Sequence, residues 1–283
     1  MKSFCFKTNN TQILNYLLKR IEEIDFENLI YSQNQFKIYK NVIIHYIGNE
    51  NTKFYKFLIN LIEEIVIEFY EEKILKQLIN YNYFYFDEYE KNKILENCIQ
   101  ILEPEICYKK ISDIKSVEQY IKENNAMILD GFVQFRLKVY LEYLDEITDS
   151  AVNQFIIEKE YKEFIGLLRV YVESKTPKND VLHLIYMNGE SILLDEKRNI
   201  VSVSENIYNA KYLSDISFSS NDLALNTLLC LLPKRIEIHL INNEDEFINT
   251  LQLIFQNRVT ICKECDICKT YKMLNNVKIS HNK

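Results

Sequence analysis

Cys262, Cys265 and Cys268 stand three residues apart near the end of the chain, in the segment CKECDIC. On a helix, residues at this spacing spread over about 120° of the surface, and in a loop their thiolates can converge on one point. They could therefore hold a metal ion, exchange a disulfide or remain reduced thiols. The other cysteines are scattered along the chain: Cys5, Cys98, Cys107 and Cys230.

A metal ion at these cysteines would require a further ligand. Structural zinc takes four ligands, so the fourth would come from His281, His239 or Cys230. An iron-sulfur cluster is the other cofactor considered. The ferredoxin run would continue with Cys-x3-Cys-Pro, but Lys272 and Met273 occupy those positions. The full ferredoxin motif is absent, and a cluster held by three cysteines and an outside ligand stays open.

The segment also contains two overlapping C-x-x-C pairs, which can act as redox dithiols when nearby cations or a helix N-terminus lower a thiol pKa. Lys263 and Lys269 favour the thiolate, whereas Glu264 and Asp266 oppose it. Metal binding, a redox or regulatory disulfide, and inert reduced thiols therefore remain three separate interpretations.

No catalytic signature accompanies the cysteines. The sequence holds neither a G-x-S-x-G turn nor an H-E-x-x-H helix, and each histidine is more simply explained as a surface or core residue. Loops that bind nucleotide phosphates need closely spaced glycines, whereas the glycines here are isolated: Gly48, Gly131, Gly166 and Gly189. The sequence identifies no catalytic residue and no nucleotide motif, and it favours a protein that is not an enzyme.

The charge balance argues against a nucleic-acid-binding protein. With 34 Lys and Arg against 41 Asp and Glu, the formal net charge is -7, and phosphate backbones attract concentrated positive charge. Residues 269–283 carry four lysines and no acidic residue. We predict a solvated, frayed terminus there, and nucleic-acid binding through these lysines is the weakest hypothesis.

Several observations favour a cytoplasmic location. Polar residues soon after Met1 interrupt any apolar core of a secretory signal. The most apolar helical segment, residues 60–70, carries Glu63, Glu64 and Glu68, so no membrane span is predicted. Cysteines stay reduced in the cytoplasm, and an odd count of 7 agrees with unpaired thiols.

The pattern of expected helices and strands predicts an α+β fold. In this fold a small N-terminal α/β unit is followed by a helical region. Residues 1–48 form the first unit, with a helix through Ile13 to Ile21 and a turn at Ser32-Gln33-Asn34. Its expected strands are rich in β-branched and aromatic residues and lie at 3–7, 29–31, 36–39 and 42–46.

Residues 49–175 show helical periodicity and predict a bundle of about four helices. One helix is expected to stop at Pro104, and the long stretch from 116 to 173 is expected to break near Thr148-Asp149-Ser150. An apolar face from Phe132 to Ile147, including Phe135 and Val139, would bury Arg136 in an ion pair.

Residues 176–262 predict a C-terminal α+β unit, a β-meander followed by a βαβ unit, and residues 263–283 form a cysteine-containing tail. Asn188-Gly189 predicts the hairpin turn. The expected strands lie at 181–187, 191–194, 200–203, 236–240 and 259–262. In 236–240, apolar residues alternate with Glu237 and His239, which predicts a strand with one buried face. Two helices separate the later strands. One runs from about Asn221 to before Pro233 and is capped by Ser220 or Asn221, and the other is capped by Asn243. Whether the N- and C-terminal strands share a sheet is left open.

Three separated segments resemble the YtxC-like sporulation protein family in order and spacing. They read DGFVQFRL (130–137), IIEKEYKEFIGLLRVYVE (156–173) and FINTLQLIFQNRVTICKECDIC (247–268). The family belongs to spore-forming bacteria and implies no established catalytic residue. The resemblance therefore implies a sporulation-associated protein whose molecular activity is open.

Together with the missing catalytic motifs, this resemblance favours a factor that works by binding protein partners, with a metal-binding C-terminal cysteine cluster. The alternative is a thiol-redox or iron-sulfur protein that uses Cys262, Cys265 and Cys268.

Overall fold

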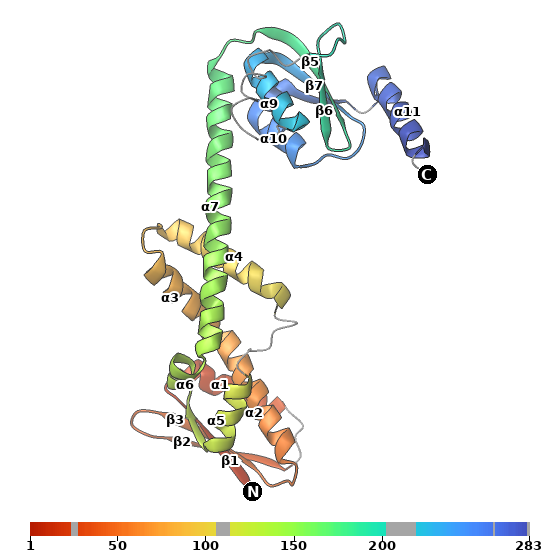
Figure 1. Cartoon of the computed structure of the whole chain (residues 1–283). Helices are drawn as coiled ribbons and strands as arrows, with labels where there is room; N and C mark the ends of the chain where they lie inside the picture. Colours follow the sequence, from red (N-terminus) through yellow and green to blue (C-terminus); the bar gives the residue numbers. More distant parts are fainter. Residues whose placement is uncertain (24–27, 106–113, 202–218, 263, 282–283) are drawn as a thin grey trace. The chain divides into compact units, whose positions relative to one another are not determined.

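The computed structural model describes residues 1–23, 28–105, 114–201, 219–262 and 264–281. The chain divides into two compact units, residues 1–158 and residues 159–283, and each contains a four-stranded sheet of its own (Figure 1). The division falls inside α7 (Lys138–Ser174). Helices and mixed sheets in both units confirm the predicted α+β class.

The sheet of the first unit has the strand order β2-β3-β1-β4. Antiparallel pairing joins β1 to β3 and β2 to β3, whereas β4 runs parallel to β1. Phe4 and Phe6 alternate with half-buried residues along β1 and enter the core. The bounds of the strands are β1 (Lys2–Thr8), β2 (Leu29–Gln35), β3 (Lys40–Tyr46) and β4 (Ala126–Ile128). Sequence reasoning did not predict β4.

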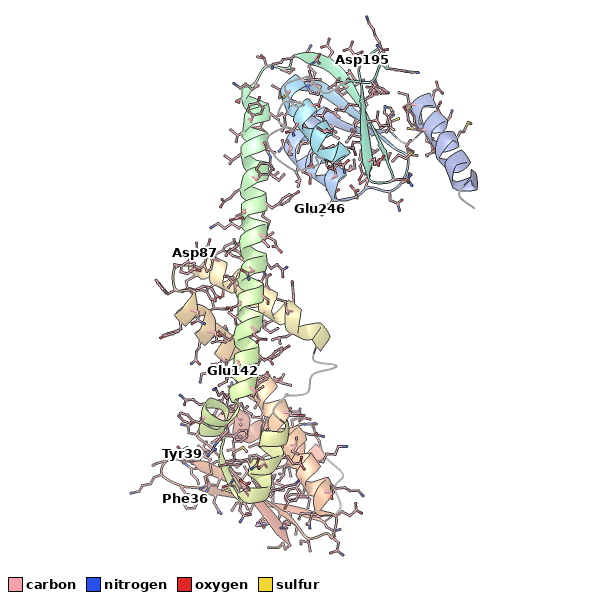
Figure 2. The ribbon with its side chains drawn as sticks, viewed as in Figure 1. Phe36, Tyr39, Asp87, Glu142, Asp195 and Glu246 are labelled. Carbon is pink, nitrogen blue, oxygen red and sulfur yellow. The ribbon has the colours of Figure 1, made fainter. Side chains whose placement is uncertain are left out.

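The turn predicted at Ser32-Gln33-Asn34 is wrong, because these residues lie inside β2. The chain turns instead at the predicted strand 36–39, where the Phe36 N–H donates to the Tyr39 carbonyl at 2.9 Å (Figure 2). An edge strand keeps its ladder through backbone groups while its polar side chains face water, so composition alone misplaced the turn.

Helices of the first unit pack with the sheet around one apolar core, which includes Leu17, Ile62 and Leu144. Between α2 and α3 the backbone widens into a π-helical turn, η1. The bounds are α1 (Thr11–Glu23), α2 (Asn51–Val66), η1 (Ile67–Glu71), α3 (Glu72–Asn82), α4 (Glu88–Glu105), α5 (Ile114–Glu123) and α6 (Leu129–Arg136). The helix predicted to stop at Pro104 ends one residue later.

The helix break predicted near Thr148 is wrong, since α7 runs unbroken through this region. The Thr148 and Ser150 hydroxyls donate to carbonyls four residues earlier, those of Leu144 and Glu146, and so remain compatible with a helix.

The chain breaks earlier, at Leu137 between α6 and α7. That change of direction leaves Phe135 and Val139 exposed by 73% and 49%, and Arg136 is exposed as well. The continuous apolar face and the buried Arg136 ion pair that we predicted are therefore not present.

The sheet of the second unit has the strand order β6-β5-β7-β8. β5 pairs antiparallel with β6 through the Asn188-Gly189 turn, where both residues adopt positive φ, as this hairpin type requires. β7 lies parallel to both β5 and β8, as a strand-helix-strand crossover predicts. The bounds are β5 (Asn179–Met187), β6 (Glu190–Leu194), β7 (Pro233–Leu240) and β8 (Val259–Cys262). The predicted strand 200–203 reduces to a bridge between Leu194 and Ile200, and 202–203 lie outside the described residues.

The two faces of this sheet are covered differently (Figure 1). α9 (Ser220–Leu231), α10 (Glu246–Phe255) and the end of α7 share one apolar core with Leu184 and Ile238 on the first face. A smaller cluster of Ile185, Leu194 and Ile267 lies on the other face, where α11 (Asp266–His281) packs. The cap of α9 is Ser219 rather than the predicted Ser220 or Asn221, and the cap of α10 is Asp245 rather than the predicted Asn243. A short 3-10 helix, η2 (Gln256–Arg258), links α10 to β8.

The frayed terminus predicted for residues 269–283 is wrong for the described part, because α11 continues to His281. Lys269 and Lys272 therefore lie on a helix. No described helix combines the length and the apolar character required to cross a bilayer.

Candidate metal centre

Four ligand atoms gather at one edge of the second sheet. The sulfurs of Cys262, Cys265 and Cys268 and one ring nitrogen of His239 all lie within 4.8 Å of one another. His239 Nδ1 is 3.2 Å from Cys265 Sγ and 3.5 Å from Cys268 Sγ. Cys268 Sγ is 3.6 Å from Cys265 Sγ and 3.9 Å from Cys262 Sγ. The structure thus brings the three predicted cysteines together with one of their three candidate partners.

Secondary structure fixes each of these side chains. His239 and Cys262 are register partners on β7 and β8, so both leave the same face of the sheet. The Lys269 N–H donates to the Cys265 carbonyl, so Cys265 lies at the start of α11 and Cys268 in its first turn. Two strands and a helix N-terminus therefore supply the group, which is a rigid way to present donors.

The group is sheltered from solvent. His239 is 1% exposed and Cys268 is fully buried, whereas Cys262 and Cys265 are half-buried. The described cysteines are free thiols, and the sulfur-sulfur distances are far longer than the about 2.05 Å of a disulfide. Shielding of this kind favours coordination over exposed thiol chemistry.

Local electrostatics shift the pKa values of two of the thiols in opposite directions. Burial alone would raise the pKa of Cys265, but hydrogen bonds from the Cys268 N–H and the Cys262 thiol outweigh burial and lower it. Burial raises the pKa of Cys268 to about 12, and its hydrogen bond with Cys265 adds to the effect. Cys265 is therefore the thiolate that a metal ion meets most readily.

The environment of His239 keeps its imidazole neutral. Burial lowers its pKa, and the adjacent His183 lowers it further, against an opposing effect of Glu237. A neutral ring offers a lone pair to a metal ion, which is the form that coordination requires.

The other two predicted partners are placed differently. Cys230 lies exposed on α9, the helix that covers the opposite face of the sheet, and it is not part of the group. His281 ends α11, and its side chain lies outside the described residues.

Sequence reasoning missed His183 and Glu237, which lie beside His239 on the same sheet face. His183 Nδ1 is 3.1 Å from His239 Nε2 and 3.3 Å from Glu237 Oε2. The sequence held one signal for this grouping, because Glu237 and His239 alternate with apolar residues and so share one face of their strand. That alternation predicted a solvent-facing side, whereas α11 covers this face at His239.

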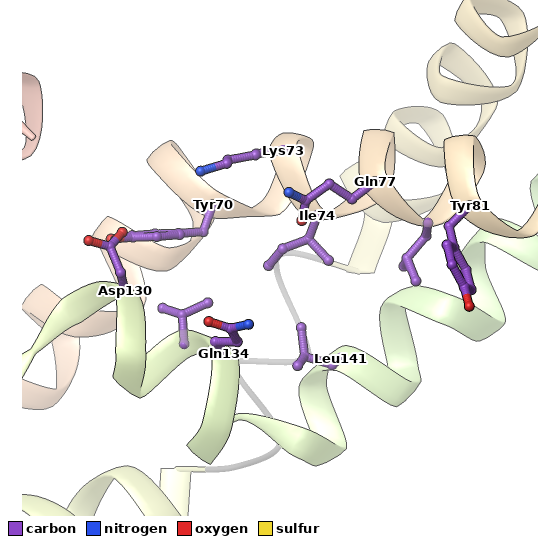
Figure 3. A pocket seen from close by; sticks show the side chains of 10 residues that line it. Tyr70, Lys73, Ile74, Gln77, Tyr81, Asp130, Gln134 and Leu141 are labelled. Atoms are coloured by element: carbon purple, nitrogen blue, oxygen red, sulfur yellow. The ribbon is translucent and has the colours of Figure 1, made fainter.

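A separate hollow of about 510 Å³ lies in the first unit, with Tyr70 and Asp130 at one end (Figure 3). The Tyr70 hydroxyl donates to Asp130 Oδ1 at 2.8 Å, and burial, with Asp130, raises the pKa of Tyr70. Its lining mixes apolar side chains with amide and amine groups, among them Lys73, Ile74, Gln77, Val133, Gln134 and Leu141.

Comparison with known proteins identifies the family. The YtxC-like family profile matches residues 56–260, so the chain belongs to this family. The uncharacterised protein YtxC of Bacillus subtilis (strain 168) is 26% identical over 211 residues, which cover 70% of this chain and 74% of that protein. No solved structure matches the chain. The family match ends at residue 260, before the three cysteines.

Proposed function

We propose that the protein is a non-enzymatic factor whose second unit binds a single zinc ion through Cys262, Cys265, Cys268 and His239. The observation that carries this proposal is the spacing of the four donors. Tetrahedral zinc with bonds of about 2.3 Å to sulfur and about 2.0 Å to nitrogen sets sulfurs about 3.8 Å apart and nitrogen about 3.5 Å from sulfur. Four of the six donor pairs lie 3.2 to 3.9 Å apart, and all six lie within 4.8 Å.

The same spacing favours one ion over an iron-sulfur cluster. A cluster places several irons and bridging sulfides between its cysteine ligands, so it holds the sulfurs farther apart than a single ion does. All four donors here fit within 4.8 Å. A histidine paired with three thiolates is also a common donor set of structural zinc.

Four protein ligands leave no open position on tetrahedral zinc, so the ion would be structural rather than catalytic. It would tie α11 to the edge formed by β7 and β8. The apolar contact between α11 and the sheet is small and centres on Ile267 with Ile185 and Leu194. Metal coordination would supply the stabilisation of α11 that such a small apolar contact lacks.

The role of this unit is proposed to be protein binding in the cytoplasm during sporulation. The family resemblance supports the association with sporulation, and the lack of catalytic motifs supports a binding role. Deletion of the gene in its host tests the association: heat-resistant spores are expected to fall at least tenfold, and unchanged spore numbers contradict it.

Elemental analysis of protein purified without added metal tests the zinc site. The cysteine group is expected to hold one zinc per chain, with little iron. Cys262→Ser, Cys265→Ser, Cys268→Ser and His239→Asn should each abolish this stoichiometric zinc. Cys230→Ser should keep it because Cys230 lies outside the group. Cobalt substitution should give thiolate-to-cobalt absorption in the native chain and the Cys230 variant.

The thiol-redox alternative rests on the Cys265 and Cys268 sulfurs, 3.6 Å apart. It predicts metal-free protein whose cysteines cycle reversibly between dithiol and disulfide. Metal-free protein as purified, with thiol titres that fall on mild oxidation and recover on reduction, would replace the zinc proposal.

A further inference from the structure

The His239 ring has a second nitrogen, and it points to another pair of donors. Nε2 lies 3.1 Å from His183 Nδ1, and Glu237 Oε2 lies 3.3 Å from the same His183 atom. The donors of His183, Glu237 and His239 all fall within 4.8 Å of one another. Two imidazoles and a carboxylate at this spacing form a nitrogen-rich donor set of the kind that divalent transition metals take.

Strand register builds this set as firmly as it builds the cysteine group. His183 on β5 pairs with Glu237 on β7, and His239 follows Glu237 by two residues. All three side chains therefore leave one face of the sheet. The rings of His183 and His239 stack with centroids 5.3 Å apart, which holds their nitrogens in position.

Glu237 divides its two oxygens between two partners. Arg235 Nη2 contacts Oε1 at 2.5 Å, which leaves Oε2 facing His183. Oε2 is therefore the oxygen that can bind an ion together with His183, in the monodentate mode.

A zinc ion in the cysteine group changes what these donors can do. Without an ion, His239 can carry its proton on Nδ1 and accept a hydrogen bond at Nε2 from His183. With zinc on Nδ1, the ring proton moves to Nε2 and is donated to His183 Nδ1, which then faces Glu237 Oε2 as a second acceptor. The 3.3 Å contact between these two acceptors is repulsive unless a cation joins them.

We propose that His183, Glu237 and His239 form a second site for a divalent transition-metal ion, with the His239 imidazole bridging it to the cysteine-bound zinc. The incoming ion replaces the proton on Nε2, which leaves to solvent. Zinc with three thiolates carries a net negative charge, which attracts the second cation.

The second site differs from the first in access and in coordination. His183 and Glu237 side chains are 15% and 25% exposed, so an ion can enter from solvent. Three protein ligands leave a position for water or a small anion. The nitrogen and oxygen donors suit zinc or copper(II).

Cobalt(II) titration of the full chain tests the second site, because only the cysteine group gives thiolate-to-cobalt absorption. We expect two ions in the native chain and one in His183→Gln or Glu237→Gln, with the thiolate band unchanged. His45→Gln is the matched control, since His45 lies in the first unit against Ser3. Circular dichroism and melting curves confirm that each variant is folded.

The outcomes separate the two proposals. One ion with a thiolate band in the native chain overturns the second site and leaves the zinc proposal intact. Absence of the thiolate band overturns the zinc proposal. The second site then stands if His183→Gln weakens the affinity for the remaining ion at least tenfold, and it is overturned if the affinity is unchanged. A copper(II) resonance that persists when cobalt replaces zinc in the cysteine group overturns the bridge, because a shared imidazolate couples the two spins.

Discussion

His239 and Cys262 are register partners on adjacent parallel strands, and both project toward the N-terminus of α11. Parallel strands end at the same edge of a sheet, so a donor near the end of β7 and another at the end of β8 meet without any loop rearrangement. The helix that follows β8 supplies the remaining sulfurs within its first turn. The site is therefore a consequence of sheet register as much as of cysteine spacing.

Thiol reactivity should follow the local electrostatics of the cysteine group. In metal-free protein, iodoacetamide is expected to alkylate Cys265 about tenfold or more faster than Cys268, because the Cys265 pKa is lowered and the Cys268 pKa is raised to about 12. Mass spectrometry of timed digests measures both rates. Exposed Cys230 is the internal reference, and zinc should protect Cys265 but not Cys230. Equal rates at Cys265 and Cys268 would contradict the assigned difference.

Zinc removal should release α11 before it affects the sheet. On this face the helix packs mainly through Ile267, with Cys265 and Tyr271 at the edge of the cluster. An isolated helix of this length is marginal in water. Chelation is expected to raise amide hydrogen exchange in the first turn of α11, while β7 stays protected between β5 and β8. Exchange that rises equally in β7 would show that the metal supports the whole unit instead.

Much of the second unit was predictable from sequence, and the reason lies in strong local signals. Asn188-Gly189 and the apolar alternation of Ile236, Ile238 and Leu240 fixed a hairpin and a half-buried strand that the structure contains. The cysteine spacing likewise indicated three of the four donors that lie within 4.8 Å of one another, whereas metal binding by them stays a prediction. Family membership followed from three segments and agrees with the match over residues 56–260.

What sequence could not supply depends on contacts between distant elements. The choice of His239 among three candidate ligands required the pairing of β7 with β8. Strand β4 was missed because its three residues give too short a pattern, and its partner β1 lies more than a hundred residues earlier. The unbroken α7 was missed because hydroxyl groups that favour helix ends can also bond back to the preceding turn.

Two identical substitutions should have opposite effects on the second unit. Gly189 has φ +79° in the β5–β6 turn, so Gly189→Ala is expected to cost about 1 kcal/mol of unfolding free energy. Gly166 lies inside α7 with no atom near an added methyl group, so Gly166→Ala should add about 0.5 to 1 kcal/mol. Urea unfolding with equal m-values measures both changes. A loss of stability for Gly166→Ala would contradict the open surroundings of that position.

Glu71 should make the stability of the first unit depend on pH in a definite direction. This carboxylate lies in the π-helical turn η1 and accepts a hydrogen bond from the Tyr140 hydroxyl. Burial raises the pKa of Glu71, and the Tyr140 hydrogen bond opposes the rise only in part. The folded state therefore binds this proton more tightly than the unfolded state does.

The sign of the effect follows from linkage. A carboxyl whose pKa is raised on folding gains stability as the pH falls through its folded pKa, and the gain is complete below the unfolded value near 4.5. Relative to Glu71→Gln, which does not titrate, the native chain should become more stable between pH 7 and pH 4, by less than about 1 kcal/mol because the group is partly solvated. Urea midpoints of both proteins at each pH measure the difference. A relative loss of stability on acidification would mean that the Tyr140 hydrogen bond, rather than burial, controls this carboxylate.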